Sequence, residues 1–110
     1  MPTVAGRLGL WLLLGIAAST TAADAQSAIA RGKAIVEANC ARCHAVGRTG
    51  ESTHPEAPPF RTLSSRYPIE ALEEAFAEGI STGHPDMPQF VATPEQIKAI
   101  IAYITSIQNH

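Results

Sequence analysis

The sequence predicts a small all-α domain in which three main helices are joined by two long loops. Apolar residues recur at helical spacing in three separate segments, residues 27–39, 69–79 and 94–107. The segments between them, 45–68 and 81–92, are rich in proline, glycine, serine and threonine, which favour turns. No stretch shows the apolar–polar alternation of a half-buried strand. A chain of 110 residues has room for one such domain.

The first 25 residues differ from the rest and are typical of a cleavable export signal. Arg7 supplies a positive charge, residues 8–18 form an uninterrupted apolar run, and small residues follow at Ala23-Asp24-Ala25. A membrane anchor is the alternative, but eleven apolar residues fall short of the roughly 20 that span a bilayer. We therefore expect a signal peptide over residues 1–25 and a mature domain over residues 26–110. Cleavage after Ala23 is the second option.

The first predicted helix, residues 27–39, carries a glycine on its apolar face. Ile29, Gly32, Val36 and Cys40 recur on one side of this helix. A glycine inside a helix costs up to about 1 kcal/mol relative to alanine. Gly32 therefore indicates that another element approaches the helix closely there. The alternative is simple tolerance of a glycine near a helix start.

The other two predicted helices show clear beginnings and ends. In residues 69–79 the glutamates face water, Gly79 suits the helix end, and the buried stripe consists of Ile69, Leu72 and Phe76. In the last helix, Thr93 is the expected N-cap, with proline at the first position and a glutamine three residues after the cap. A short helical turn is also expected over residues 62–66.

The motif Cys40-Ala41-Arg42-Cys43-His44 directly follows the first predicted helix. Two cysteines separated by two residues, with histidine after the second, are the attachment signature of a c-type haem. At the end of a helix, the two sulfurs reach the two vinyl-derived carbons on one porphyrin edge, and the imidazole binds the iron from one side. Export of the chain agrees with this prediction, because covalent haem attachment takes place outside the cytoplasm.

Three other interpretations of the cysteine pair were weighed. A thioredoxin-like redox pair requires a βαβ setting, which this sequence does not show. A zinc site requires further ligands, and the chain has two cysteines and only scattered histidines. A structural disulfide is the third alternative.

The formal net charge of −2 gives no cluster of basic residues of the kind that binds nucleic acid, so no nucleic-acid partner is predicted.

Met87 is the candidate for the second iron ligand. It is the only methionine outside the predicted signal, and it lies between Pro85 and Pro88 in the loop before the last helix. A thioether is a soft, neutral ligand that favours ferrous iron and raises the reduction potential of a haem. One alternative is a methionine that fills the apolar core. The other is His84, which would give bis-histidine ligation and a lower potential.

Residues 27–108, which contain these motifs, resemble the class I c-type cytochromes, small periplasmic proteins with one haem. The resemblance rests on Gly32, Val36, Cys40-Ala41-Arg42-Cys43-His44, Ala57-Pro58-Pro59-Phe60, Met87 and Tyr103. It implies the cytochrome c class I fold, with three main helices and loops wrapped around one covalently bound haem c. It also implies that the first and last helices cross near Gly32 and Tyr103.

The resemblance further implies the surroundings of the haem. Cys40 and Cys43 would attach it, and His44 and Met87 would ligate the iron. The carbonyl of Pro58 would accept the Nδ1 proton of His44 and fix the imidazole orientation. The side chains expected to wall the haem are Phe60, Leu72 and Phe76. Candidates to hydrogen-bond a haem propionate are Arg66 and Tyr67, for which a surface turn is the alternative.

The predicted function is one-electron transfer in the periplasm, without a catalytic residue. The chain would shuttle electrons between a donor and an acceptor protein, or serve as the haem subunit of a periplasmic dehydrogenase or reductase; a terminal oxidase is another candidate partner. Lys33 and Lys98 are the only lysines, so docking through a lysine-rich face is not expected. A small apolar patch around the exposed haem edge would dock instead. The alternative is a peroxidase-like haem enzyme or gas sensor with a labile sixth ligand.

Overall fold

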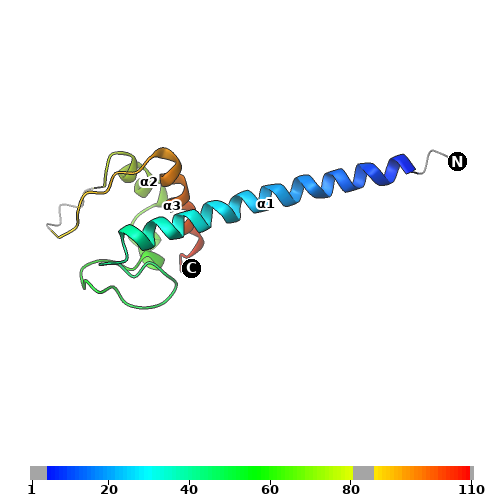
Figure 1. The fold of residues 1–110 in the computed structure, drawn as a ribbon. Coiled ribbons are helices and arrows are strands. Elements are labelled where there is room, and N and C mark those ends of the chain that lie inside the picture. Colours follow the sequence, from blue (N-terminus) through cyan, green and yellow to red (C-terminus); the bar gives the residue numbers. More distant parts are fainter. Residues whose placement is uncertain (1–4, 81–85, 110) are drawn as a thin grey trace.

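The computed structural model describes residues 5–80 and 86–109, and for residues 5–20 it describes the backbone only. Helix α1 (Ala5–Asn39) is followed by the 3₁₀ helix η1 (Phe60–Ser65), α2 (Ile69–Ala77) and α3 (Pro94–Ser106). Within the described residues there is no strand, only one isolated antiparallel bridge between Ile80 and Phe90. The predicted all-α fold of three main helices is confirmed (Figure 1).

Helix α1 begins well before the predicted start at residue 27 and is 35 residues long. Residues 5–31 contain no proline and many alanines and leucines, which are strong helix formers, so nothing in the local sequence ends the helix there. The N-terminal part of α1 extends away from the packed domain (Figure 1). In the described part of the chain, no helix is long and apolar enough to cross a membrane. The fold does not show whether the chain is cleaved, so the signal peptide over residues 1–25 stays a prediction.

Helix α3 packs against both α1 and α2, and it approaches α1 tightly at Gly32. A Cβ atom at Gly32 would lie 2.6 Å from the carbonyl carbon of Ala99 and 2.8 Å from the Cβ of Tyr103. Both distances are shorter than van der Waals contact. The close approach predicted from the mid-helix glycine is therefore confirmed, and it involves the backbone of α3.

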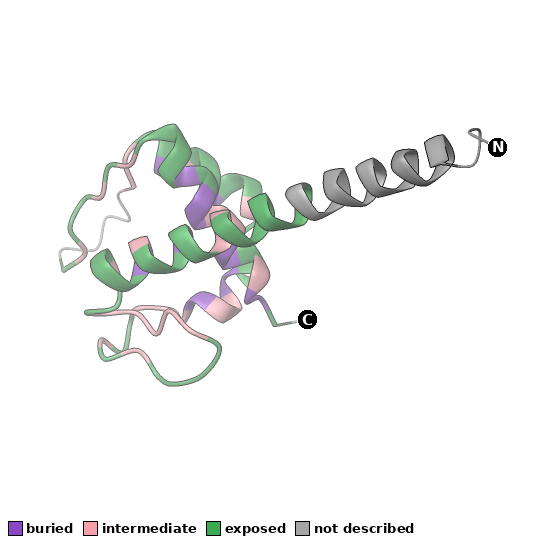
Figure 2. Ribbon diagram, turned by 45° about the vertical axis from the view of Figure 1, so that its right-hand side comes forward, coloured by how far each residue is buried: buried purple, intermediate pink, exposed green. Residues whose placement is uncertain are grey.

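The core lies where α1, η1, α2 and α3 meet (Figure 2). Val36 of α1 and Ile100 and Ile104 of α3 are almost completely buried. The rest of the core cluster consists of Phe60, Leu63, Leu72, Phe76, Ile97, Tyr103 and Ile107. In their described parts, α1, α2 and α3 thus turn the predicted apolar stripes toward the core, with Ile29 and Ile69 only partly buried, and the glutamates of α2 are exposed.

The helix ends follow the local signals in the sequence. The Thr93 hydroxyl accepts a hydrogen bond from the backbone N–H of Gln96 at 3.2 Å, and the Gln96 side chain accepts one from the backbone N–H of Thr93 at 2.9 Å. This is the predicted capping arrangement of α3. After α2, Gly79 has a φ of +83°, which glycine adopts without strain. The turn expected over residues 62–66 is the longer η1.

Tyr103 connects α3 to the loop that follows the cysteine motif, because its hydroxyl donates a 2.6 Å hydrogen bond to the carbonyl of Val46. Burial raises the pKa of Tyr103, Glu37 acts in the same direction, and Arg48 opposes them. A tyrosine whose pKa is raised on folding contributes stability below its unfolded pKa. That contribution is lost as the pH rises through the folded pKa.

We expect Tyr103→Phe to lower the free energy of unfolding by about 1 kcal/mol at neutral pH, because one partly buried hydrogen bond is lost. The difference between the two proteins should shrink above about pH 10, where the hydroxyl begins to ionise in the unfolded chain. Guanidinium unfolding followed by circular dichroism at both pH values measures this. A difference that stays constant across the range would contradict the assignment.

Candidate functional site

The cysteine motif forms a tight turn at the end of α1. The backbone N–H of Cys40 donates to the carbonyl of Val36 at 2.8 Å and continues the helical pattern. The carbonyl of Cys40 then accepts from the N–H groups of Cys43 at 3.3 Å and His44 at 3.0 Å. Both cysteines are free thiols and half-buried. The turn gathers two thiols and one imidazole within five consecutive residues.

The thiol of Cys40 lies in an apolar environment. Its side chain packs against the hydrophobic core, and burial raises its pKa to about 11. The thiol is therefore protonated at neutral pH. Surroundings of this kind suit an apolar group such as the edge of a porphyrin.

The imidazole of His44 is oriented by the loop that follows it. Its Nδ1 atom lies 2.8 Å from the carbonyl oxygen of Pro58. A carbonyl oxygen only accepts hydrogen bonds, so Nδ1 is the donor, and in the neutral imidazole Nε2 then keeps its lone pair. The ring of Phe60 lies against the imidazole, with centroids 5.0 Å apart and the planes tilted by 47°. The hydrogen bond that the family resemblance implies is present, and it leaves Nε2 as the atom able to bind a metal.

The loop 45–59 folds back onto the motif through several hydrogen bonds. The N–H of Phe60 donates to the carbonyl of Ala45 at 2.9 Å, and the N–H of Ala45 donates to the hydroxyl of Ser52 at 3.0 Å. The Thr53 hydroxyl donates to the carbonyl of Arg42. These contacts close the loop beside the cysteine motif, and the Pro58 carbonyl of this loop accepts the hydrogen bond from His44.

Gln108, after the end of α3, supports Phe60 from the side of the core. Its buried amide group donates to the carbonyls of Phe60 at 2.7 Å and Ile104 at 2.8 Å. Its side-chain oxygen accepts from the N–H of Ser64 at 2.8 Å. Three backbone groups of η1 and α3 therefore hydrogen-bond to this one side chain.

We expect Gln108→Leu to lower the free energy of unfolding by about 2 to 3 kcal/mol, because buried backbone groups lose their hydrogen bonds. Guanidinium unfolding measures the loss. Asn109→Ala is the matched control, since Asn109 is exposed and bonds to Arg61 through its backbone N–H. Equal stability of the Gln108 and Asn109 variants would show that the network contributes nothing.

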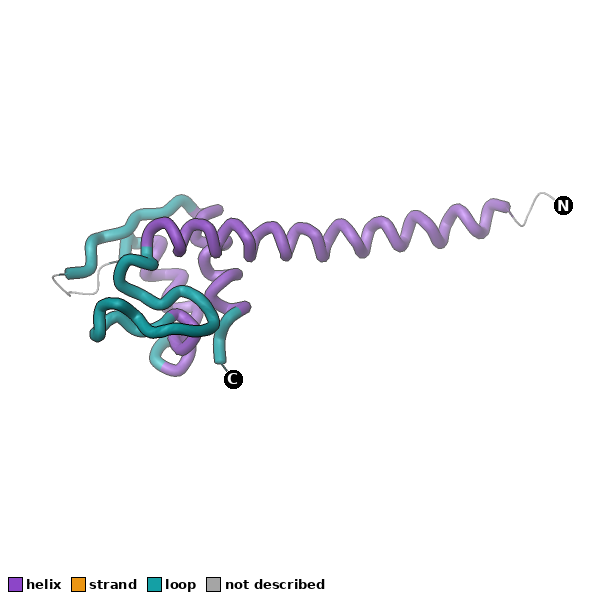
Figure 3. Tube along the Cα trace, turned by 60° about the horizontal axis from the view of Figure 1, so that its bottom comes forward, coloured by secondary structure: helices purple, strands orange, loops and turns teal. Residues whose placement is uncertain are grey.

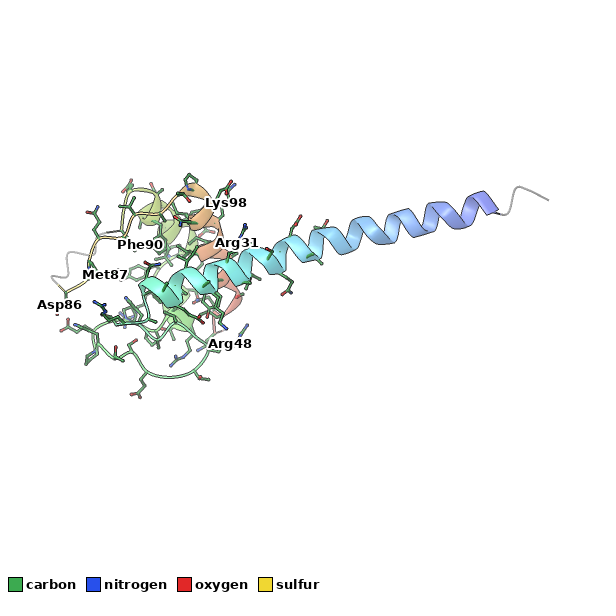
Figure 4. The ribbon with its side chains drawn as sticks, viewed as in Figure 1. Arg31, Arg48, Asp86, Met87, Phe90 and Lys98 are labelled. Atoms are coloured by element: carbon green, nitrogen blue, oxygen red, sulfur yellow. The ribbon has the colours of Figure 1, made fainter. Side chains whose placement is uncertain are left out.

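Met87 lies on a loop whose base is fixed to the domain. The N–H of Ile80 donates to the carbonyl of Phe90 at 3.2 Å, and Phe90 packs edge-on against Phe76 of α2 with ring centroids 6.4 Å apart. Met87 is half-buried, on the side of the domain where α1 ends (Figure 4). Figure 3 shows the same arrangement, with both long loops near that end of α1. His84 and Pro85 lie outside the described residues.

The other side chains predicted to contact the haem divide into two groups. Leu72 and Phe76 are buried in the core. Arg66 and Tyr67 are exposed in the turn between η1 and α2, and Tyr67 is 47% exposed. Their hydrogen bonding to a propionate stays a prediction. Among the residues that the structure describes, no group of three or more acidic, histidine or cysteine side chains is placed to hold a metal ion.

The family model for cytochrome c matches residues 29–108, which is most of the chain. The chain belongs to the cytochrome c family. No curated protein and no solved structure gives a significant match. Cytochromes c bind haem c covalently through cysteines, so the cofactor of this cytochrome is haem c attached through Cys40 and Cys43. When bound, the haem supplies reversible one-electron exchange at its iron, which makes this an electron-transfer protein.

The residues of this cytochrome fit that cofactor. The two free thiols match thioether formation, and the Nδ1–H of His44 donates to the Pro58 carbonyl, which leaves Nε2 as the nitrogen able to bind iron. The loop that follows the motif contributes further half-buried apolar residues, which are Val46, Ala57, Pro58 and Pro59. The family match thus agrees with the thiols and the imidazole that the fold brings together in one turn.

One residue near this site was given no role by the sequence. His54 carries no signal beyond its place in a loop, yet its Nε2 atom lies 3.2 Å from a carboxylate oxygen of Asp86. The two residues are 32 positions apart in the chain. No sequence pattern predicts this pair, because the contact depends on the paths of both long loops.

Proposed function

We propose that this cytochrome c is an exported one-electron carrier whose haem iron is ligated by His44 and Met87. The observation that carries the proposal is the hydrogen bond between His44 Nδ1 and the Pro58 carbonyl, at 2.8 Å. It fixes the imidazole tautomer and leaves Nε2 available to the iron. Packing of the Phe60 ring on the imidazole restricts its rotation further.

Ligation by Met87 is supported by the position and chemistry of its loop. The loop base is fixed by the Ile80–Phe90 bridge, and Met87 is half-buried near the end of α1 that carries the cysteine motif. No other methionine is present in residues 26–110. A thioether opposite an imidazole stabilises ferrous iron and gives a raised potential.

With His44 and Met87 both bound to the iron, the haem would have no open position for a substrate. Its residues then do three things: they attach the haem, hold the two ligands in place and cover the haem faces with apolar side chains. Electron exchange through the haem edge remains, and catalysis is not part of the function. This separates the proposal from a peroxidase-like enzyme, which needs an open or labile sixth position.

Carbon monoxide binding to the reduced protein tests the proposal. We expect slow or undetectable binding at neutral pH, because Met87 must first leave the iron. The oxidised protein should show the weak long-wavelength band of a methionine–iron bond. Rapid carbon monoxide binding together with the absence of that band would favour the open-site alternative.

We also propose export to the periplasm and a weak, largely apolar docking surface. Residues 8–18 and Ala23-Asp24-Ala25 support export. Val91, four residues after Met87 in the chain, is 74% exposed, and the chain has only two lysines. Contact with redox partners would therefore be mainly apolar. The donor and acceptor are proteins of a periplasmic electron-transfer chain, for example a dehydrogenase or a terminal oxidase or reductase. The mass of the purified exported protein should correspond to one haem plus a chain that starts at Gln26, or at Asp24.

A further inference from the structure

The loops that carry His44 and Met87 meet away from the core, at His54 and Asp86. His54 Nε2 lies 3.2 Å from Asp86 Oδ2, within hydrogen-bond distance. The His54 side chain is 29% exposed and that of Asp86 66% exposed. Since a carboxylate only accepts, the imidazole donates from Nε2. The contact therefore joins the loop 45–59 to the loop before α3.

On one side, this contact is connected to the haem-attachment motif. The backbone N–H of His54 donates to the carbonyl of Cys43 at 3.2 Å, and the carbonyl of His54 accepts from the N–H of Ala57 at 3.0 Å. The backbone of His54 is thus held between the second haem-attaching cysteine and the segment that leads to Pro58. Its ring is presented toward Asp86 from a fixed position.

On the other side, Asp86 directly precedes Met87. The base of this loop is fixed by the Ile80–Phe90 bridge and by the packing of Phe90 on Phe76. In Figure 4, Asp86 and Met87 lie on the outer part of this loop and Phe90 lies nearer its base. A contact at Asp86 therefore restrains the loop at the residue next to the thioether, in addition to the restraint at its base.

We propose that His54 is a positioning residue that holds the Met87 loop closed through its hydrogen bond to Asp86. The proposal rests on ligation of the iron by Met87, as proposed above. The pair slows the dissociation of Met87 from the iron and so limits the access of external ligands to it. It does not change the identity of the ligands.

The test is the rate at which excess imidazole replaces Met87 in the ferric protein, followed by stopped-flow loss of the long-wavelength methionine–iron band. Because both side chains are partly exposed, the hydrogen bond contributes only a small free energy, as is typical of polar pairs at the surface. We expect about a threefold to fivefold faster reaction in His54→Ala. The reduction potential should move little, since both ligands remain when the loop is closed.

Conservative and paired variants separate this role from general loosening of the loop. His54→Gln keeps an N–H donor near the position of Nε2 and should restore a rate close to wild type. Asp86→Ala should react as fast as His54→Ala, and the double variant no faster than either, because all three lack the same contact. Thr53→Ala is the matched control, since it removes a hydrogen bond to Arg42 within the same region and leaves the contact between the loops intact.

Equal rates in wild type and His54→Ala would overturn the proposal, as would equal acceleration by Thr53→Ala. Additive effects of the His54 and Asp86 substitutions would do the same. If the wild-type protein lacks the methionine–iron band altogether, ligation by Met87 is wrong and the proposed function itself fails. The two failures therefore give different spectra before any kinetic measurement.

Discussion

Replacing Met87 with alanine is expected to remove the methionine–iron band of the oxidised protein and to lower its reduction potential by roughly 0.1 V or more. Axial ligands are among the strongest determinants of haem potential, and loss of a neutral thioether removes the preference for ferrous iron. The sixth position would then be free for water or another weak ligand. The reduced Met87→Ala protein should accordingly bind carbon monoxide rapidly.

Val91→Ala is the matched control for Met87→Ala. Val91 lies four residues farther along the chain and is 74% exposed, so its side chain can be shortened with little effect on packing. Optical redox titration of both variants and wild type measures the potentials. A Met87→Ala protein with unchanged spectrum and potential would remove Met87 from the ligand set and revive His84 as a candidate.

The second large effect is expected at the crossing of α1 and α3. Gly32→Ala places a methyl group 2.6 Å from the carbonyl carbon of Ala99 and 2.8 Å from the Cβ of Tyr103. Relief requires backbone movement, because one of the obstructing groups is the main chain of α3. We expect a loss of about 2 to 3 kcal/mol in the free energy of unfolding, despite the better helix propensity of alanine.

Gly47→Ala provides the comparison for Gly32→Ala. A Cβ at Gly47 meets no atom within 4 Å, and the substitution should change stability by less than about 0.5 kcal/mol. Guanidinium unfolding of the haem-loaded proteins gives both values. If the two alanine variants are equally stable, the helices do not cross at Gly32 as tightly as described.

Features that depend on neighbouring residues could be predicted from the sequence. The capping arrangement at Thr93 and Gln96, the glycine turn after α2 and the buried stripe of each helix follow from local spacing, and the structure confirms them. Gly32 also indicated a long-range contact, because a glycine inside a helix lowers helix stability and a close contact with another element can offset that cost. The start of α1 was predicted too late, since the alanine-rich segment before residue 27 contains no signal that ends a helix.

Contacts between distant side chains could not be predicted. Gln108 bonds to Ser64 across 44 positions and His54 to Asp86 across 32 positions. Each pair requires a particular path of a long loop, and proline and glycine indicate that a chain turns without specifying where it returns. The His44–Pro58 hydrogen bond was expected only from the family resemblance. The spacing of those two residues alone does not indicate it.

The most direct test of the account is the mass of the purified, denatured chain after extraction with acidified organic solvent. We predict that the pigment stays with the polypeptide, that the mass exceeds that of residues 26–110 by one haem, and that the modified peptide contains Cys40 and Cys43. A colourless chain of unmodified mass, or a pigment that the solvent removes, would contradict a covalently bound haem and every conclusion built on it.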